Sequence, residues 1–208
     1  MPKISEAQRE TRRQHILAAA MRCFSRDGFH ATTTADIVRE SGVSQGALYL
    51  YFATKDDIIV ALADDRRQGE ALINALAESE QDPVEGLKLL LELYGRSLSD
   101  PARMEQRRVG VQGWAEALRS PTVRESVTAN IAAVGREIES LVRRGQAAGQ
   151  IRSELNPEAF ARTLIAVFQG LILQVAWGEP IDLEAVGGVI HDMIRDSLFT
   201  AHARESHP

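Results

Sequence analysis

The chain has 208 residues, of which 44% are hydrophobic and 25% are charged, so it can bury a sizeable core and is not expected to be disordered. Its net charge of -5 argues against a protein coated in nucleic acid, but the charge is unevenly distributed. Residues 1–55 hold eight Lys and Arg against five Asp and Glu, whereas the rest of the chain holds sixteen against twenty-four. Only the N-terminal quarter is therefore basic.

The composition also excludes several kinds of site. The single cysteine, Cys23, excludes an internal disulfide and a cysteine-rich metal centre, and the five histidines show no metal-ligand spacing. The polar N-terminus does not resemble a signal peptide, and the most continuous apolar run, residues 164–176, is too short to cross a bilayer. We expect a soluble cytoplasmic protein without cofactor, metal or membrane partner.

Apolar residues recur at spacings of three and four along the whole chain, which predicts an all-α fold. In chain order, we expect helices over about residues 7–27, 34–41, 45–52 and 55–79. Later helices are expected to begin at a proline that follows a capping side chain, at Pro83, Pro101, Pro121 and Pro157.

The starts of the second and fourth helices carry a different signal. Thr33 with Asp36, and Thr54 with Asp57, each place a hydroxyl at the cap and a carboxylate three residues later. Gly42 sits where the second helix should end in a left-handed residue. Two short helices joined by a tight turn are therefore expected between two longer ones.

This arrangement is typical of a helix-turn-helix, whose second helix enters the DNA major groove. Leu48 and Phe52 are four residues apart and are predicted to pack inward. The first two helices offer further apolar side chains to the same core, which are Ile16, Ala20, Phe24, Ile37 and Val38.

The opposite face of the third helix suits contact with DNA. A glutamine amide can pair with adenine, small residues let the backbone approach base edges, and tyrosine hydroxyls commonly bond phosphate. Helix N-termini and a lysine add phosphate anchors. The predicted DNA-contacting residues are Thr33, Thr34, Ser44, Gln45, Gly46, Ala47, Tyr49, Tyr51 and Lys55. The alternative is a small helical bundle whose tyrosines only cover the edges of a core.

From about Arg12 to Leu62, the sequence resembles the DNA-binding domain of the TetR (tetracycline repressor) family of bacterial transcription regulators. The matching features are Gly28 with Phe29 after the first helix, threonines opening the second, the stretch GVSQGALYLYF, and TKDD at the start of the fourth. Family members often carry Lys or Arg beside the recognition glycine, where this chain has the neutral Gln45. Base readout is therefore expected either to be weaker or to depend more on DNA shape.

The resemblance implies a helix-turn-helix domain over residues 1–56 and an effector-binding and dimerisation domain over residues 57–208. It also implies a transcriptional repressor that binds a palindromic double-stranded DNA operator as a homodimer. An unknown small-molecule effector would then release it from the operator. A basic arm formed by Lys3, Arg9, Arg12 and Arg13 is one further possibility, and a solvated polar leader is the other.

The segment over residues 157–177 is apolar nearly all round, which favours packing on two sides. With the last helix it is predicted to form a four-helix bundle with its copy. The predicted dimerisation residues are Phe160, Leu164, Phe168, Leu171, Val175, Ile190 and Met193. The alternative is a helix buried within one subunit.

The segment over residues 101–118 offers a candidate effector site. Its apolar stripe of Met104, Val111, Trp114 and Leu118 is interrupted by arginines, and two glycines nearby leave space. The candidate effector-binding residues are Tyr94, Met104, Arg107, Arg108, Val111 and Trp114. The alternative is that the arginines extend to solvent and the glycines serve helix packing.

The sequence also bears on two other classes of function. An enzyme is disfavoured, because the chain lacks a nucleophile elbow, a P-loop, a dinucleotide fingerprint and a metal-ligand cluster. A helical dimeric scaffold, or a small-molecule-binding protein without DNA binding, remains the alternative to a repressor.

Overall fold

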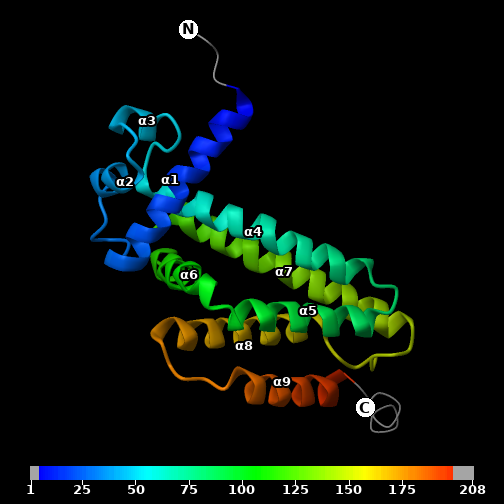
Figure 1. Cartoon of the computed structure of the whole chain (residues 1–208). Coiled ribbons are helices and arrows are strands. Elements are labelled where there is room, and N and C mark those ends of the chain that lie inside the picture. Colours follow the sequence, from blue (N-terminus) through cyan, green and yellow to red (C-terminus); the bar gives the residue numbers. More distant parts are fainter. Residues whose placement is uncertain (1–4, 199–208) are drawn as a thin grey trace. The chain divides into compact units, whose positions relative to one another are not determined.

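The computed structural model describes residues 5–198, and the side chains of all of these except 66–74, 76–78 and 197. Over this range the chain forms helices and no strand, which confirms the all-α prediction. The helices are α1 Glu6–Asp27, α2 Thr34–Ser41, α3 Gln45–Tyr49, α4 Lys55–Ser79, α5 Pro83–Ser99, α6 Met104–Glu116, α7 Pro121–Ala147, α8 Pro157–Trp177 and α9 Leu183–Leu198, with a 3-10 turn, η1, at Pro101–Arg103 (Figure 1).

The capping signals in the sequence predict most helix starts correctly. The α2 and α4 helices have the predicted bounds, and α5, α7 and α8 begin at the predicted prolines. The prediction for Pro101 was wrong in one respect, because this residue opens η1 and the α-helix begins only at Met104. Here the N–H of Arg103 bonds the carbonyl of Asp100 at 3.1 Å, so the first turn has the tighter i to i+3 pattern of a 3-10 helix.

The described residues group into two compact units, each with its own core. The first unit holds α1, α2, α3, α4 up to Arg67, α6 and the start of α7 up to Thr128. The second holds the rest of α4, with α5, the rest of α7, α8 and α9. This grouping differs from the predicted boundary after residue 56, since α6 joins the N-terminal helices.

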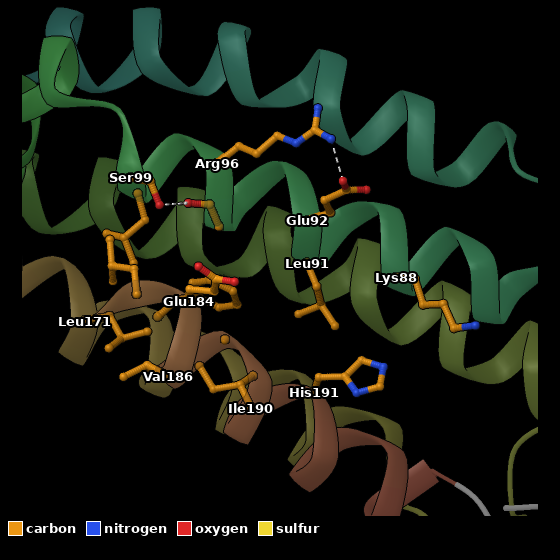
Figure 2. Close-up of a pocket in the computed structure, with 15 residues that line it drawn as sticks. Lys88, Leu91, Glu92, Arg96, Ser99, Leu171, Glu184, Val186, Ile190 and His191 are labelled. Atoms are coloured by element: carbon orange, nitrogen blue, oxygen red, sulfur yellow. Dashed lines mark hydrogen bonds and ion pairs between the residues drawn. The ribbon is translucent and has the colours of Figure 1, made fainter. Parts of the chain in front are cut away.

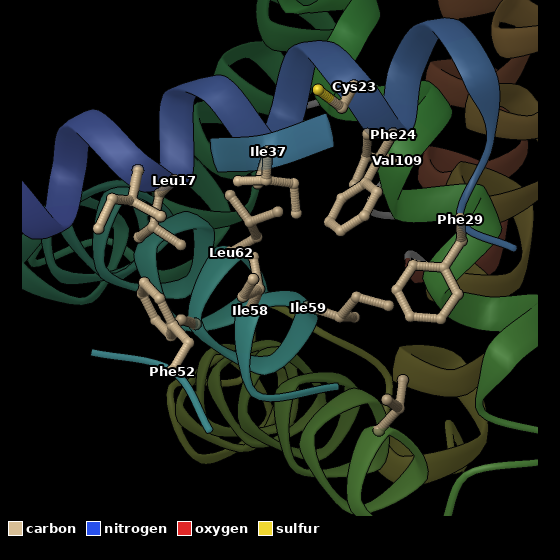
Figure 3. Packing of buried hydrophobic residues seen from close by; sticks show 14 of the residues in the cluster. Leu17, Cys23, Phe24, Phe29, Ile37, Phe52, Ile58, Ile59, Leu62 and Val109 are labelled. Atoms are coloured by element: carbon tan, nitrogen blue, oxygen red, sulfur yellow. The ribbon is translucent and has the colours of Figure 1, made fainter. Parts of the chain in front are cut away.

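The core of the first unit closes around the side chains predicted to form it (Figure 3). Phe24 and Ile37 are fully buried, and Phe24 packs on Phe29 with ring centroids 5.2 Å apart. Of the predicted core residues, Ile16, Ala20, Phe24, Ile37, Leu48 and Phe52 are buried and Val38 is half-buried. Val109 of α6 and Val123 of α7 complete the cluster.

Polar contacts also tie α6 and its C-terminal end to the N-terminal helices of this unit. Gln112 Nε2 donates to the carbonyl of Phe24 at 3.0 Å, and Ser120 Oγ donates to the Asp56 carboxylate at 2.7 Å. His30 Nε2 lies 3.2 Å from the nearly buried carboxylate of Glu116. These contacts explain why α6 belongs to the first unit although it is remote from α1 in sequence.

The second unit packs α5, α7, α8 and α9 around an aliphatic core. Its buried side chains are Val84, Leu87, Leu90, Ile138, Leu141, Val142, Ile151, Phe160, Ala161, Leu164 and Leu198. After α7 the chain folds back so closely that a Cβ on Gly145 would lie 2.5 Å from Ile151 Cδ1. A glycine at residue 145 therefore permits the turn that leads into α8.

The apolar helix α8 was predicted too short to cross a membrane, but the whole helix is longer than that run. Its 21 residues include an 18-residue window with a mean hydropathy of 1.6, of which 17% is buried. A helix of this length and composition is able to span a bilayer, but these two features alone are weak evidence for a membrane span. The same features suit a helix that packs against a partner protein.

Candidate functional site

The turn between α2 and α3 is set by local hydrogen bonds that the sequence specifies. Thr33 caps α2 in a reciprocal box with Asp36, and Gly42 ends the helix in the left-handed conformation at a φ of 67°. Ser44 then caps α3, because its hydroxyl accepts a hydrogen bond from the N–H of Ala47 at 3.2 Å. These caps fix the direction in which α3 leaves the turn.

The third helix is shorter than predicted, since it ends at Tyr49 and not near residue 52. The N–H groups of Tyr51 and Phe52 both bond the carbonyl of Leu48 at 3.0 Å, so the chain tightens and leaves the helix. It must do so because Thr54 caps α4, with its hydroxyl accepting from the N–H of Asp57 at 3.1 Å. Tyr51 and Phe52 therefore lie beyond the end of α3.

The helix presents one buried and one exposed face. Leu48 is fully buried, whereas Gln45, Gly46 and Tyr49 are exposed and Ala47 is half-buried. Leu50, which the sequence analysis did not single out, is 77% exposed. Leu50 follows the buried Leu48 by two residues, so the helical period places Leu50 on the opposite side. This spacing is the sequence signal that identifies Leu50 as exposed.

Tyr51 and Lys55 are held by contacts within the first unit. The Arg9 guanidinium of α1 lies over the Tyr51 ring, 5.9 Å from its centroid. Lys55 Nζ donates to the carbonyls of Phe29 at 2.7 Å and Thr32 at 3.1 Å, and lies 4.4 Å from the centroid of the Phe29 ring. Two of the three lysine donors are thus already used, which leaves one for a phosphate.

The threonines that open α2 differ from each other. The Thr33 hydroxyl donates to the Asp36 carboxylate at 2.6 Å, and Arg39 pairs with the same carboxylate. These contacts lower the pKa of Asp36 to about 2, with the Thr33 hydroxyl as the largest cause. Thr34 is half-buried at the first position of the helix. The basic arm is described from residue 5 onward, so Lys3 lies outside the described residues.

The predicted effector residues are divided between the two units. Tyr94 belongs to the second unit and packs on Phe168, with ring centroids 5.8 Å apart, whereas the other five lie on α6 in the first unit. The predicted α6 stripe is also corrected, because Leu118 is 83% exposed and the buried residues of α6 are Arg107, Val109, Gly113 and Glu116. Gly113 allows close packing against Ile59, whose Cγ2 would lie 4.0 Å from an added Cβ.

The arginines of α6 have opposite environments. Arg107 is buried, with 7% of its surface exposed, whereas Arg108 is exposed. Met104, Val111 and Trp114 are half-buried. The alternative in which arginines extend to solvent thus describes Arg108 and not Arg107.

A cavity of about 630 Å³ lies within the second unit, between α5, α8 and α9 (Figure 2). This volume is within the range of small-molecule sites. It is lined by Lys88, Leu91, Glu92, Gly95, Arg96, Leu98, Ser99, Phe168, Leu171, Leu183, Glu184, Val186, Gly187, Ile190 and His191. None of the charged or glycine residues of this cavity is predicted from the sequence. These residues lie close together because α5 packs near α9, and no local sequence pattern predicts that packing.

The predicted dimerisation residues are divided between the core and the surface. Phe160, Leu164 and Leu171 are buried within the second unit of one chain. Phe168 and Ile190 line the cavity, Val175 is half-buried, and Met193 is 61% exposed. Trp177 and Val189 are also exposed, by 68% and 60%.

Comparison with known proteins agrees with this architecture. Residues 16–62 match the family described as bacterial regulatory proteins, tetR family, and residues 83–198 match the C-terminal domain of BetI-type transcriptional repressors. The HTH-type transcriptional repressor Rv1474c of Mycobacterium tuberculosis is 29% identical over 207 residues, covering 95% of this chain and all of that protein.

Solved structures show the same fold. A transcriptional regulator from Saccharomonospora viridis in complex with choline has a TM-score of 0.73 and 25% identity, covering 91% of this chain and 98% of its own. The SmeT–triclosan complex has a TM-score of 0.77 and 24% identity, covering 93% and 94%. The match of residues 83–198 to the C-terminal domain of BetI-type repressors alone covers more than half of the 208 residues. The chain therefore belongs to the tetR family of bacterial regulatory proteins and is a DNA-binding transcriptional repressor.

Proposed function

We propose that this repressor binds a palindromic operator as a homodimer, with α3 of each subunit in a major groove. The observation that carries the proposal is the two-sided environment of α3, where Leu48 anchors the helix and Gln45, Gly46 and Tyr49 are exposed. A two-fold dimer would place its two recognition helices about one turn of DNA apart, roughly 34 Å. Operator symmetry would then mirror protein symmetry.

The exposed face supports a division between base and phosphate contacts. Gln45 is suited to adenine, and Gly46 with Ala47 allows close approach to base edges. Tyr49 and Tyr51 are suited to phosphate oxygens, which fix register without reading sequence. The remaining proposed DNA contacts are Thr33, Thr34, Ser44 and Lys55, at or beside helix starts.

Substitution of Gln45 tests the base contact. We expect Gln45→Ala to weaken binding to the operator by about 1–3 kcal/mol, while binding to unrelated DNA changes little, because a bidentate base contact carries sequence information. Fluorescence anisotropy with DNA selected from the source genome measures both affinities. Gln81→Ala, at an exposed glutamine between α4 and α5 in the second unit, is the matched control. An equal loss on both DNAs would assign Gln45 to the backbone contacts instead.

Lys55 tests the phosphate contacts. Lys55→Ala is expected to weaken operator binding and to reduce its dependence on salt concentration, since each neutralised phosphate releases counterions. The contacts of Nζ with Phe29 and Thr32 predict some loss of stability in the same variant. Affinity at several salt concentrations separates these effects, because an unchanged salt slope would remove Lys55 from the phosphate contacts.

We further propose that α8 and α9 form the dimer interface. The support is exposed apolar surface at Trp177, Val189 and Met193, together with the small buried share of α8. Since Phe160, Leu164 and Leu171 already pack within one chain, the interface is placed on the outer faces of these helices. Sedimentation of Trp177→Glu and of the wild type tests this placement. A wild-type chain that stays monomeric at micromolar concentration would contradict the dimer itself.

A small-molecule effector completes the proposal. Two similar proteins are solved with choline and with triclosan, which supports a small-molecule site in the C-terminal part of this chain. The effector lowers operator affinity by binding better to a state with a different separation of the two recognition helices. This mechanism would be contradicted if the effector weakened binding to a single half-site as much as binding to the full palindrome. We infer a cytoplasmic location from the same role.

A further inference from the structure

The cavity between α5, α8 and α9 has an apolar interior. Leu91 and Leu98 of α5, Phe168 and Leu171 of α8, and Ile190 of α9 contribute to its lining. Apolar walls with a few polar groups are typical of sites for small organic ligands, whose apolar part they bury.

Two glycines keep this cavity open. Gly95 of α5 and Gly187 of α9 line it, and a Cβ added to either would meet nothing within 4 Å. Neither has the positive φ that favours glycine, and glycine is disfavoured relative to alanine inside a helix. Close helix packing and backbone conformation therefore do not account for these two residues, and a side chain at either position would take up space in the cavity.

Both cationic side chains described around the cavity have a carboxylate partner, but one of its described carboxylates has no cationic partner. Lys88 Nζ pairs with Glu85 at 2.8 Å, and Arg96 pairs with Glu92 at 2.5 Å, so a carboxylate offsets each of the two cations. Among the residues that the structure describes, Glu184 is the lining carboxylate with no cationic side chain within ion-pair distance. Figure 2 shows Glu184 on the side of α9 that faces α5, near apolar side chains of the cavity.

We propose that this cavity binds a small amphipathic cation, with its charge at Glu184 and its apolar part against α5 and α8. The inference rests on the proposed function and deepens it, because it names the chemical class of the effector. A carboxylate beside an apolar cavity favours a cation over an anion of the same shape, since an anion would face like charge at Glu184.

Isothermal titration of the full-length protein with three ligands of equal chain length tests the charge preference. The probes are octyltrimethylammonium, 1-octanol and octanoate. We expect the cation to bind most tightly and octanoate least. Glu184→Gln should weaken binding of the cation about three- to fivefold, as for an exposed ion pair, and leave binding of octanol unchanged. Glu179→Gln, at an exposed carboxylate outside the cavity, is the charge control.

A second substitution tests the location independently of charge. Gly187→Leu should fill the cavity and weaken binding of both the cation and octanol. Gly188→Leu is the matched control, because Gly188 also has open space around an added Cβ but does not line the cavity. Sedimentation of each variant shows whether its fold and assembly are retained. Tighter binding of octanoate, or cation binding that neither Glu184→Gln nor Gly187→Leu weakens, would overturn the proposal.

Operator binding measured without ligand separates this inference from the function on which it rests. Wild-type protein and Glu184→Gln should bind the operator equally, and octyltrimethylammonium should release the wild type at lower concentration. Operator binding that persists while no probe binds would overturn the inference alone. Failure to bind any DNA sequence, with normal cation binding, would instead overturn the proposed function.

Discussion

The two units of this repressor use their apolar side chains in opposite ways. In the first unit, Phe24 and Ile37 are fully buried and the core closes around them. In the second, Phe168 lines an open cavity, and Trp177 and Met193 remain exposed. The first unit is thus complete as a rigid support for α3. The second keeps apolar surface available, which suits the proposed ligand site and the proposed dimer interface.

The largest expected effect comes from removing a ring from each unit. Phe24→Ala should lower the free energy of unfolding by about 3–5 kcal/mol, because it leaves a cavity in a closed core. Phe168→Ala should cost less than half as much, since its ring is half-buried and already borders open space. Urea unfolding of both variants at one protein concentration measures the two costs. Equal costs would show that the second core is packed as tightly as the first.

A pair of glycines provides a smaller test of the same difference. Gly42→Ala should destabilise the protein by about 1–2 kcal/mol, because alanine is strained at a φ of 67°. Gly170→Ala in α8 should stabilise it by up to about 1 kcal/mol, since an added Cβ meets nothing within 4 Å. Thermal unfolding measures both changes. A loss of stability in Gly170→Ala that grows on dilution would instead place a partner helix against Gly170.

The sequence predicts the first unit well because its signals are local. Thr33, Gly42 and Thr54 each act within four residues, so the bounds of α2 and α4 follow from the order of residues alone. Apolar spacing likewise identifies the buried face of α1. Leu50 is not among the predicted DNA contacts because it is apolar, although the same spacing places it on the exposed side at the end of α3.

Features that depend on contacts between distant segments are not predicted by such local patterns. Periodicity on α6 favoured a stripe ending at Leu118, but packing against Ile59 buries the face of Val109 and Gly113 instead. Lys55 is predicted as a phosphate anchor from its place at a helix start, yet its Nζ also reaches the Phe29 carbonyl, 26 residues away in sequence. The sequence therefore identifies the type of site more reliably than the contacts of each residue.

The smallest expected effect concerns the cap that starts α2. Hydrogen bonds from the Thr33 hydroxyl and N–H, and then from Arg39, lower the pKa of Asp36 from 3.8 to about 2. Because the folded pKa lies below the unfolded one, the ionised carboxylate stabilises the fold above about pH 4, and this contribution is lost as the pH falls toward 2.

Asp36→Asn should therefore destabilise the protein at pH 6, and its difference from the wild type should shrink between about pH 4 and pH 2. Urea unfolding across this range measures the difference. Thr33→Val removes the largest cause of the shift, so it should raise the pKa of Asp36 and move the window upward in pH. A difference between Asp36→Asn and wild type that stays constant down to pH 2 would mean that the cap does not depend on the charge of Asp36. In that case core packing, and not the charge of its cap, would hold the start of α2.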